Sequence, residues 1–202
     1  MTLRLVVATA NPDKAREIRS VLGAAGADVE MVERPADVPE VEETGTTLVE
    51  NARLKATALR DATGIAALGE DTGLEVDALG GAPGVFSARY AGEHASYADN
   101  VAKLLREVDA VRRASRTARF RTSVVVALAD GREILAEGVV EGVIATEARG
   151  TGGFGYDAVF APAGAGGRTF AELTPERKDA ISHRGRALRA LAPLLREAGP
   201  RP

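Results

Sequence analysis

Short apolar runs alternate with amphipathic stretches along the first part of the chain. Residues 3–8 (LRLVVA) are mostly apolar and predict a buried strand. Asn11 is a good N-cap and Pro12 suits the first helical position, so a helix should follow and end near the glycines at 23 and 26. Residues 29–32 predict a second strand, and the chain therefore opens as strand, loop, helix, strand.

An acidic, proline-containing loop at residues 33–45 separates this opening from a second helix. Thr46 or Thr47 is expected to cap that helix, which should run to about residue 63 and stop at Gly64. The segments expected next are a short strand at 65–68 that ends at Gly69-Glu70-Asp71, strand or turn at 72–79, a loop at 80–84 and a third helix from Ser96 to residue 108.

The second half predicts a β-hairpin and a helical C-terminal part. Residues 119–129 and 133–145 are strand-like, and Asp130-Gly131 between them is a strong hairpin signal. The remaining expected elements are a strand at 156–160, a helical turn at Thr174-Pro175 and a last helix, capped by Ser182, through residue 195. Strands that alternate with helices and then form a hairpin indicate an α/β fold with a mixed sheet.

Composition narrows the class of protein. The 202 residues suffice for one sizeable core and at most two small lobes, and 45% hydrophobic with 27% charged residues is typical of a soluble globular protein. A net charge of −3 argues against nucleic acid as a partner. Cysteine is absent, which excludes thiol nucleophiles, and no apolar run is long enough for a membrane span. Without a signal-peptide pattern, a cytoplasmic location is expected.

The first candidate for chemistry is the turn between the first strand and helix, Thr9-Ala10-Asn11-Pro12-Asp13-Lys14. Free amides and a positive partial charge at a helix N-terminus suit phosphate. A lysine in the first turn opposes the helix dipole unless an anion is present. A plain capped turn explains the segment equally well, and the chain has no P-loop pattern.

Acidic residues form the second candidate, because Glu42 and Glu43 precede one helix while Glu70 and Asp71 end a predicted strand. Ligands of α/β sheets usually bind at the carboxyl ends of the strands. One carboxylate from each segment, together with waters and substrate phosphates, would suit Mg²⁺. Solvated turn acids are the alternative interpretation.

Glycines and aromatics gather at residues 150–157 (GTGGFGYD), in a chain with only 4% aromatic residues. The spacing fits a dinucleotide fingerprint, but no helix is expected to follow, so we reject that function. The segment could stack a base and read its edge; alternatively, Phe154 and Tyr156 simply pack into the core.

The fourth candidate is a group of cationic residues around the start of the last helix: Lys178, His183 and Arg184. They could bind a ligand, or they could simply be exposed charges in contact with solvent.

Taken together, these segments resemble the inosine triphosphate pyrophosphatase family (Ham1-like, RdgB-type dITP/XTP pyrophosphatases). The motifs that carry the resemblance are TANPDK at Thr9, EETGTTLVENARLKA at Glu42, DTGLEVDALGGAPGVFSARYAG at Asp71, TGGFGYDAVF at Thr151 and ISHRG at Ile181. They follow one another in this order over most of the chain, which chance would hardly produce.

The resemblance implies a hydrolase that converts non-standard purine triphosphates, such as ITP, dITP and XTP, to the nucleoside monophosphate and pyrophosphate. It also implies Mg²⁺ dependence and a homodimer. The implied fold is one catalytic domain over residues 1–202, in which a long curved mixed sheet is flanked by helices and two lobes border a substrate cleft. The preference among the three triphosphates stays open.

The resemblance further implies roles for individual residues. Asp71 would accept a proton and, with Glu43, would bind magnesium. The substrate would be bound by residues of the matching motifs: Thr9, Ala10, Asn11, Pro12, Asp13 and Lys14 around the phosphates, Thr72 beside the proton acceptor, Phe154, Gly155, Tyr156 and Asp157 with His183 and Arg184 at the base, and Lys178.

Small departures and two competing functions accompany this assignment. Glu70 stands where the family usually has Asp, so Glu70 is not assigned as a metal ligand. The other departures are Thr72, Ala158 and Asp179. A non-catalytic nucleotide-binding module would gain nothing from Glu43 and Asp71 beside phosphates. A Maf-type pyrophosphatase acting on modified pyrimidines would lack the GFGYD and SHRG motifs.

Overall fold

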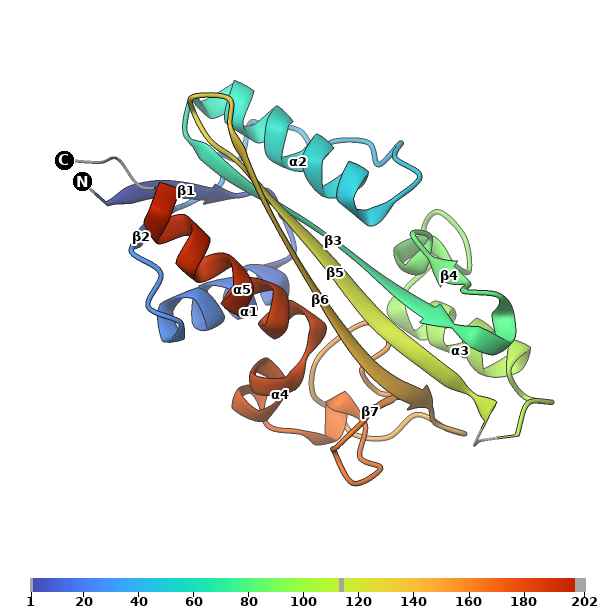
Figure 1. The fold of residues 1–202 in the computed structure, drawn as a ribbon. Coiled ribbons are helices and arrows are strands. Elements are labelled where there is room, and N and C mark those ends of the chain that lie inside the picture. Colours follow the sequence, from blue (N-terminus) through green and yellow to red (C-terminus); the bar gives the residue numbers. More distant parts are fainter. Residues whose placement is uncertain (1, 113–114, 199–202) are drawn as a thin grey trace. The chain divides into compact units, whose positions relative to one another are not determined.

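The computed structural model describes residues 2–112 and 115–198 (Figure 1). Its strands are β1 (Leu3–Val7), β2 (Val29–Val32), β3 (Ala66–Val76), β4 (Pro83–Gly84), β5 (Thr117–Ala127), β6 (Glu133–Ile144) and β7 (Phe160–Pro162). Its α-helices are α1 (Pro12–Ala24), α2 (Leu48–Thr63), α3 (Tyr97–Glu107), α4 (Pro175–Ile181) and α5 (His183–Ala198). Short 3-10 helices lie at Asp77–Leu79, Ser87–Arg89 and Phe170–Glu172.

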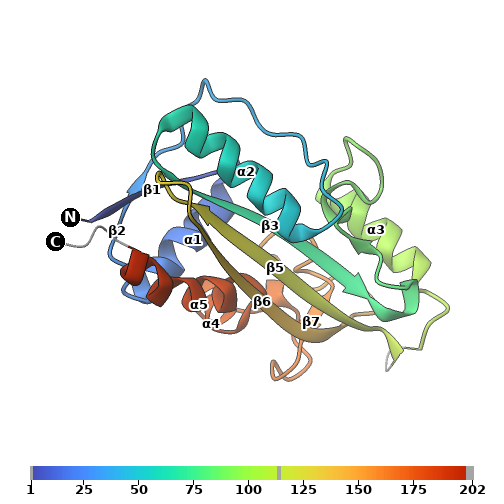
Figure 2. The same cartoon turned by 45° about the horizontal axis from the view of Figure 1, so that its top comes forward.

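The strands form one mixed sheet. Its order is β2-β1-β3-β5-β6-β7, and β4 pairs with β3 off this path. β1 pairs in parallel with β2 and β3, whereas β4 and β7 pair antiparallel with β3 and β6. Figure 2 shows β3, β5 and β6 as long neighbouring strands. The predicted α/β class with a mixed sheet is confirmed.

The chain divides into two compact units. The first unit contains residues 2–71, 122–138 and 184–198, and the second contains 72–112, 115–121 and 139–183. β3, β5 and β6 each contribute residues to both units. Within the described ranges, none of the helices has the length and apolar character needed to cross a membrane.

In the first unit, neighbouring residues of the strands face different helices, as the pleat of a strand requires. Leu5, Ala66 and Val124 pack with the apolar sides of α1 and α5. Val6 and Ala67, the next residues along β1 and β3, belong to a cluster with α2. The same alternation places residues 69 and 71 of β3 toward α2, and residue 70 toward α1 and α5.

The second helix begins and ends as predicted, and it lies directly on β3. Thr47 is its N-cap in a reciprocal capping box with Glu50, and Gly64 ends it in the left-handed conformation. A Cβ atom on Gly69 of β3 would lie 2.0 Å from the carbonyl oxygen of Ala52 in α2. Only glycine therefore permits this close approach of helix and strand.

The core of the second unit is built from aromatic rings. Phe120 of β5 contacts Phe160 edge-on, with ring centroids 4.8 Å apart, and lies 6.2 Å from Phe170. His183 stacks on Phe120 at 4.5 Å. These rings pack in one cluster with Leu74, Leu104, Ile144 and Tyr156. Tyr156 and Phe160 belong to this core, and they anchor the segment from residue 150 onward, which contains the glycine-rich candidate site.

The prediction that the strand at 65–68 ends at Glu70 and Asp71 is wrong. β3 continues through both residues to Val76, and both are buried at 5% and 6% exposure. Charged residues inside a strand are normally solvent-exposed, so the sequence pattern favoured a turn. The parallel neighbour β1 does end here, because its last pairing joins Val7 to Leu68. The acids thus lie just beyond the end of β1 rather than beyond the end of β3.

The prediction of a strand at 156–160 is also wrong. The peptide groups of this segment form turns, in which the amides of Val159 and Phe160 both donate to the carbonyl of Tyr156 at 3.0 Å. Strand pairing starts only at Phe160, in β7. Other boundaries moved little: β5 starts and ends two residues earlier than predicted, and α5 continues to Ala198.

Candidate functional site

A cluster in the first unit joins α2 to Asp71. Asn51 and Lys55 lie one turn apart on the side of α2 that faces β3. The Asn51 amide donates to Asp71 Oδ2 at 3.2 Å, and Lys55 Nζ donates to Asp71 Oδ1 at 3.1 Å. Lys55 Nζ also lies 2.5 Å from Glu43 Oε1 and 3.0 Å from the carbonyl oxygen of Glu70. Glu43 and Asp71, predicted from separate segments, therefore meet at one cation.

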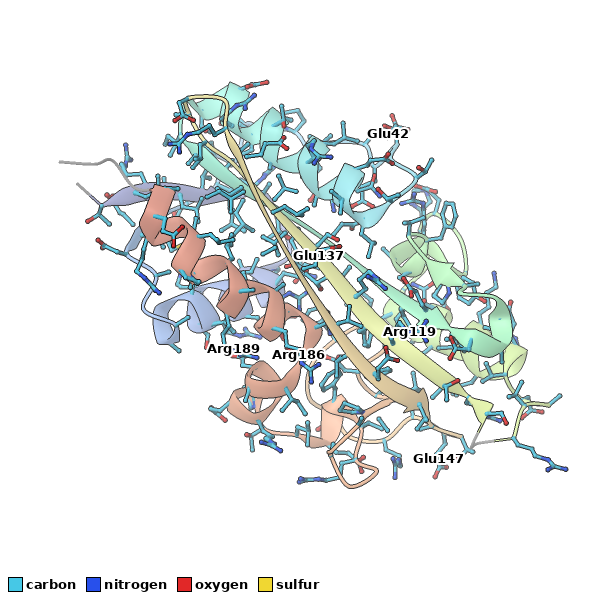
Figure 3. The ribbon with its side chains drawn as sticks, in the orientation of Figure 1. Glu42, Arg119, Glu137, Glu147, Arg186 and Arg189 are labelled. Atoms are coloured by element: carbon cyan, nitrogen blue, oxygen red, sulfur yellow. The ribbon has the colours of Figure 1, made fainter. Side chains whose placement is uncertain are left out.

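Asn51 fixes the loop that carries Glu43. Its side-chain oxygen accepts from the amide of Gly45 at 2.8 Å, while its amide nitrogen donates to Asp71. Asn51 is fully buried, so both hydrogen bonds form away from water. Glu42 is exposed on the same loop (Figure 3). Of the two predicted loop acids, only Glu43 therefore reaches the cluster.

Opposing effects act on the charge of Asp71. Burial raises the pKa of this carboxyl above its ordinary value, Lys55 lowers it, and the neighbouring Glu43 raises it again. Burial lowers the pKa of Lys55, but Asp71 and Glu43 outweigh that effect and raise it overall. The ammonium therefore stays charged, and Asp71 is more basic than an exposed aspartate.

Glu70 faces the opposite side of β3 and is neutralised there. Arg184, in the first turn of α5, donates from Nε and Nη2 to the Glu70 carboxylate at 2.7–3.1 Å, and its Nη1 donates to Glu17 of α1. Arg184 is only 2% exposed. These carboxylates raise its pKa further despite burial, so the guanidinium remains ionised. Glu70 and Asp71 are thus not one acidic pair, because each has its own cationic partner.

The turn before α1 caps itself. Asn11 Oδ1 accepts from the amides of Asp13 and Lys14 at 2.9 and 3.2 Å, and Thr9 Oγ1 accepts from the amide of Asn11 at 3.1 Å. These two helix amides are therefore already bonded to Asn11. The Lys14 ammonium is the positive charge of this turn that interacts with Glu70 and Asp71. Burial lowers its pKa, and Glu70 is the strongest opposing influence.

In the second unit, Asp157 organises the glycine-rich loop. One oxygen, Oδ2, accepts from the amide of Phe154 at 2.8 Å and from Lys178 Nζ at 2.6 Å. Lys178 Nζ also lies 4.6 Å from the centre of the Phe154 ring. Gly153, with φ +70°, leaves the space for this carboxylate, since a Cβ there would lie 2.0 Å from Asp157 Oδ2. Phe154, Asp157 and Lys178, which were predicted to contact the substrate, are thus brought together.

The predicted base-binding residues of the second unit differ in exposure. Phe154 is half-buried, and its ring lies 6.1 Å from that of Tyr97, which is 48% exposed. Tyr156 packs in the core, where its hydroxyl donates to the carbonyl of Ser87 at 2.9 Å. His183 is buried against Phe120. Phe154 is therefore the aromatic side chain of this loop that a planar ligand can reach.

The assigned roles of the predicted site residues, including those of Thr72 and Arg184, stay predictions. In the structure the guanidinium of Arg184 is bound by Glu70. Sequence reasoning missed Asn51 and Lys55. Their signal was available, because both are polar residues on the helix face that also carries the buried residues Leu48, Ala52, Ala56 and Leu59.

The potential metal ligands are few. In residues 2–112 and 115–198, no three His, Asp or Glu side chains gather as they would around a fully protein-bound metal ion. Glu43 and Asp71 are two carboxylates, and a magnesium ion that keeps waters and binds substrate phosphates is usually held by one or two. The arrangement suits a metal that completes its shell with substrate.

Comparisons with known proteins identify the family of the chain. The sequence pattern of the Ham1 family matches residues 5–194. The dITP/XTP pyrophosphatase of Streptomyces coelicolor is 47% identical over 196 residues, which cover 96% of this chain and 98% of that protein. The HAM1 protein from Coxiella burnetii has a TM-score of 0.86 at 40% identity, covering 96% and 99% of the two chains. The nucleoside-triphosphatase, or dITP/XTP pyrophosphatase, from Mycobacterium abscessus has a TM-score of 0.74 at 45% identity, covering 96% and 100%.

Proposed function

The chain belongs to the Ham1 family, and we propose that it hydrolyses non-standard purine triphosphates. ITP, dITP or XTP would yield the nucleoside monophosphate and pyrophosphate, which removes these nucleotides from the pool. The observation that carries the proposal is the meeting of Glu43 and Asp71 at one ammonium group. Such a pair suits a cation-assisted attack on a polyphosphate.

The proposed cofactor is Mg²⁺, held by Glu43 and Asp71. The Lys55 ammonium already lies 2.5 and 3.1 Å from oxygens of these carboxylates, so both can reach one positive ion. Their oxygens are hard donors, which magnesium prefers. When bound, Mg²⁺ would stabilise negative charge on the phosphates and the leaving pyrophosphate.

The side chains of the first unit perform the remaining steps of the proposed reaction. Lys14 binds phosphate oxygens, since it is a partly buried cation beside the acid cluster. Asp71 orients a water molecule and accepts its proton as the water attacks phosphorus. Asn51 holds Asp71 in place through its amide.

The proposed base site lies in the second unit. Phe154 stacks on the purine, a contact worth roughly 1–3 kcal/mol that does not discriminate between bases. The amides of the loop donate hydrogen bonds to the 6-oxo group of hypoxanthine or xanthine, and Lys178 also contacts the substrate. Adenine carries a 6-amino group there, which would leave these donors unpaired. A site of this kind can reject the wrong analogue by about 10⁴-fold.

The wider setting is proposed on the same basis. We expect a single two-lobed catalytic domain that works as a homodimer in the cytoplasm. Its partner is the purine triphosphate, without nucleic acid or membrane. The net charge of −3 fits a protein that binds one small polyanion in a local pocket rather than a nucleic acid backbone.

Product analysis tests the reaction. Incubation with ITP and Mg²⁺ should yield IMP and pyrophosphate, and ATP should be hydrolysed far more slowly. Anion-exchange chromatography identifies the products and gives the rates of hydrolysis. It is run with ITP, dITP, XTP, GTP and ATP, each with magnesium or with EDTA. Release of IDP and orthophosphate would show a different reaction, and equal rates for ITP and ATP would refute the base site.

The alkaline dependence of KM tests the phosphate-binding role of Lys14. Its pKa is lowered by burial, so the amine should lose its proton at a pH below the ordinary 10.5. Phosphate binding needs the cation, and KM for ITP should therefore rise as pH increases through that value. In Lys14→Arg the guanidinium stays charged and the rise should disappear. A steady-state pH series on both proteins decides the point, and identical alkaline limbs would contradict it.

A further inference from the structure

The Lys55 ammonium lies where three oxygen atoms converge. Glu43 Oε1 is 2.5 Å away, the Glu70 carbonyl oxygen 3.0 Å and Asp71 Oδ1 3.1 Å. Two carboxylates and one backbone carbonyl are the donor types that hard divalent cations select. The side chain of Lys55 is 13% exposed, so water contributes little to stabilising its charge there. The oxygen atoms around the Lys55 ammonium are therefore of the kind that would also suit a divalent metal ion.

Glu43 and Asp71 need a positive charge between them. Their side chains are 26% and 8% exposed, and they come from a loop and a strand that the fold brings together. Like charges this close repel, and burying them without a counter-ion is costly. The counter-ion in the structure is Lys55, anchored on α2, which packs closely on β3 at Gly69.

A divalent ion at the same carboxylates would compete with this ammonium. Asp71 Oδ1 and Glu43 Oε1 each bond Lys55 directly, so they can turn to a metal only as the ammonium gives them up. A bound polyphosphate offers the displaced ammonium new oxygen partners. Metal and substrate would therefore bind together better than either binds alone.

We propose that Lys55 is a built-in counter-ion that holds the cation position between Glu43 and Asp71 until a divalent ion arrives with its polyphosphate. This inference rests on the proposed function and deepens its metal requirement. It makes the free protein a weak binder of divalent ions, because each ion must first displace a paired ammonium. It also keeps the two carboxylates aligned before the metal binds.

Binding of Mn²⁺ to the nucleotide-free protein tests the proposal. In Lys55→Met the competing charge is gone, and Mn²⁺, followed by the electron paramagnetic resonance signal of the free ion, should bind at least tenfold more tightly than to the parent chain. Lys55→Arg keeps a cation and should remain a weak binder. Arg53→Met is the matched control, because it also removes one positive charge from α2. Arg53 pairs with Glu133, so this variant should leave the Mn²⁺ affinity unchanged.

Thermal unfolding provides the second readout. Lys55→Met should lose stability in EDTA, because its two carboxylates then lack a counter-ion, and should regain it with Mn²⁺. A variant that binds Mn²⁺ no more tightly than the parent chain, or that Mn²⁺ fails to stabilise, would overturn the proposal. No nucleotide is present in either measurement. Failure to hydrolyse ITP would therefore refute the proposed function and leave this result standing.

Discussion

Replacing Asp71 by asparagine should lower kcat for ITP hydrolysis by about 10²–10⁴-fold, which is the usual contribution of a positioned general base. The amide keeps the shape of the side chain but accepts no proton at neutral pH. Binding of ITP at saturating Mg²⁺ should change little, because Lys14 and the base loop remain. Single-turnover kinetics give the rate, and equilibrium titration with a non-hydrolysable analogue gives the affinity.

Asp61→Asn is the control for this prediction. Asp61 lies in α2 rather than in β3, its side chain is 62% exposed, and it pairs only with its neighbour Arg60 among the ion pairs of the described residues. The control should retain full activity. An Asp71→Asn protein with near-normal kcat would remove Asp71 from the chemistry, and equal losses in both variants would indicate a general effect of charge.

Replacing Arg184 by methionine should lower the free energy of unfolding by about 3–5 kcal/mol, the range seen when one partner of a buried ion pair is removed. Methionine retains much of the volume, so the loss reports mainly the carboxylates of Glu70 and Glu17 left without their cation. Glu70 is buried with a side-chain exposure of 3%, and water therefore cannot take over the role of the guanidinium. Urea unfolding followed by circular dichroism measures the change.

The double variant Arg184→Met with Glu70→Gln should regain part of this stability, because the amide no longer needs a counter-ion. Arg186→Met serves as the matched control on the same helix. Arg186 is exposed on α5, where Figure 3 labels it beside Arg189, and its replacement should shift the stability by less than about 0.5 kcal/mol. Similar losses for Arg184→Met and Arg186→Met would contradict the role of the buried pair.

Local signals made much of the fold predictable. The caps of α2 at Thr47 and Gly64, and the hairpin turn around Gly131, follow from side-chain and backbone preferences of single residues. β3 was not predictable in this way. Its polar residues Glu70 and Asp71 looked like a strand end, since the cations that neutralise them come from distant helices and no local pattern links those segments.

The residues of the candidate site were easier to predict than the way in which they pair. The motifs identified Glu43, Asp71 and Asp157, and the structure brings Glu43 and Asp71 to one cation. Lys55 escaped notice because lysine on a helix is usually a solvated charge. The pairing of Arg184 with Glu70 spans 114 residues of sequence, and only the folded chain shows that this guanidinium is already occupied by carboxylates.

Gly69 has a consequence for how far this site can be altered. With the carbonyl of Ala52 only 2.0 Å from where a methyl group would stand, even alanine would act as a wedge between helix and strand. The wedge would lift the Lys55 and Asn51 side chains off Asp71 together, although Gly69 itself carries no functional group. Efforts to retune metal choice should therefore substitute the side chains at the cluster and leave the spacing between helix and strand intact.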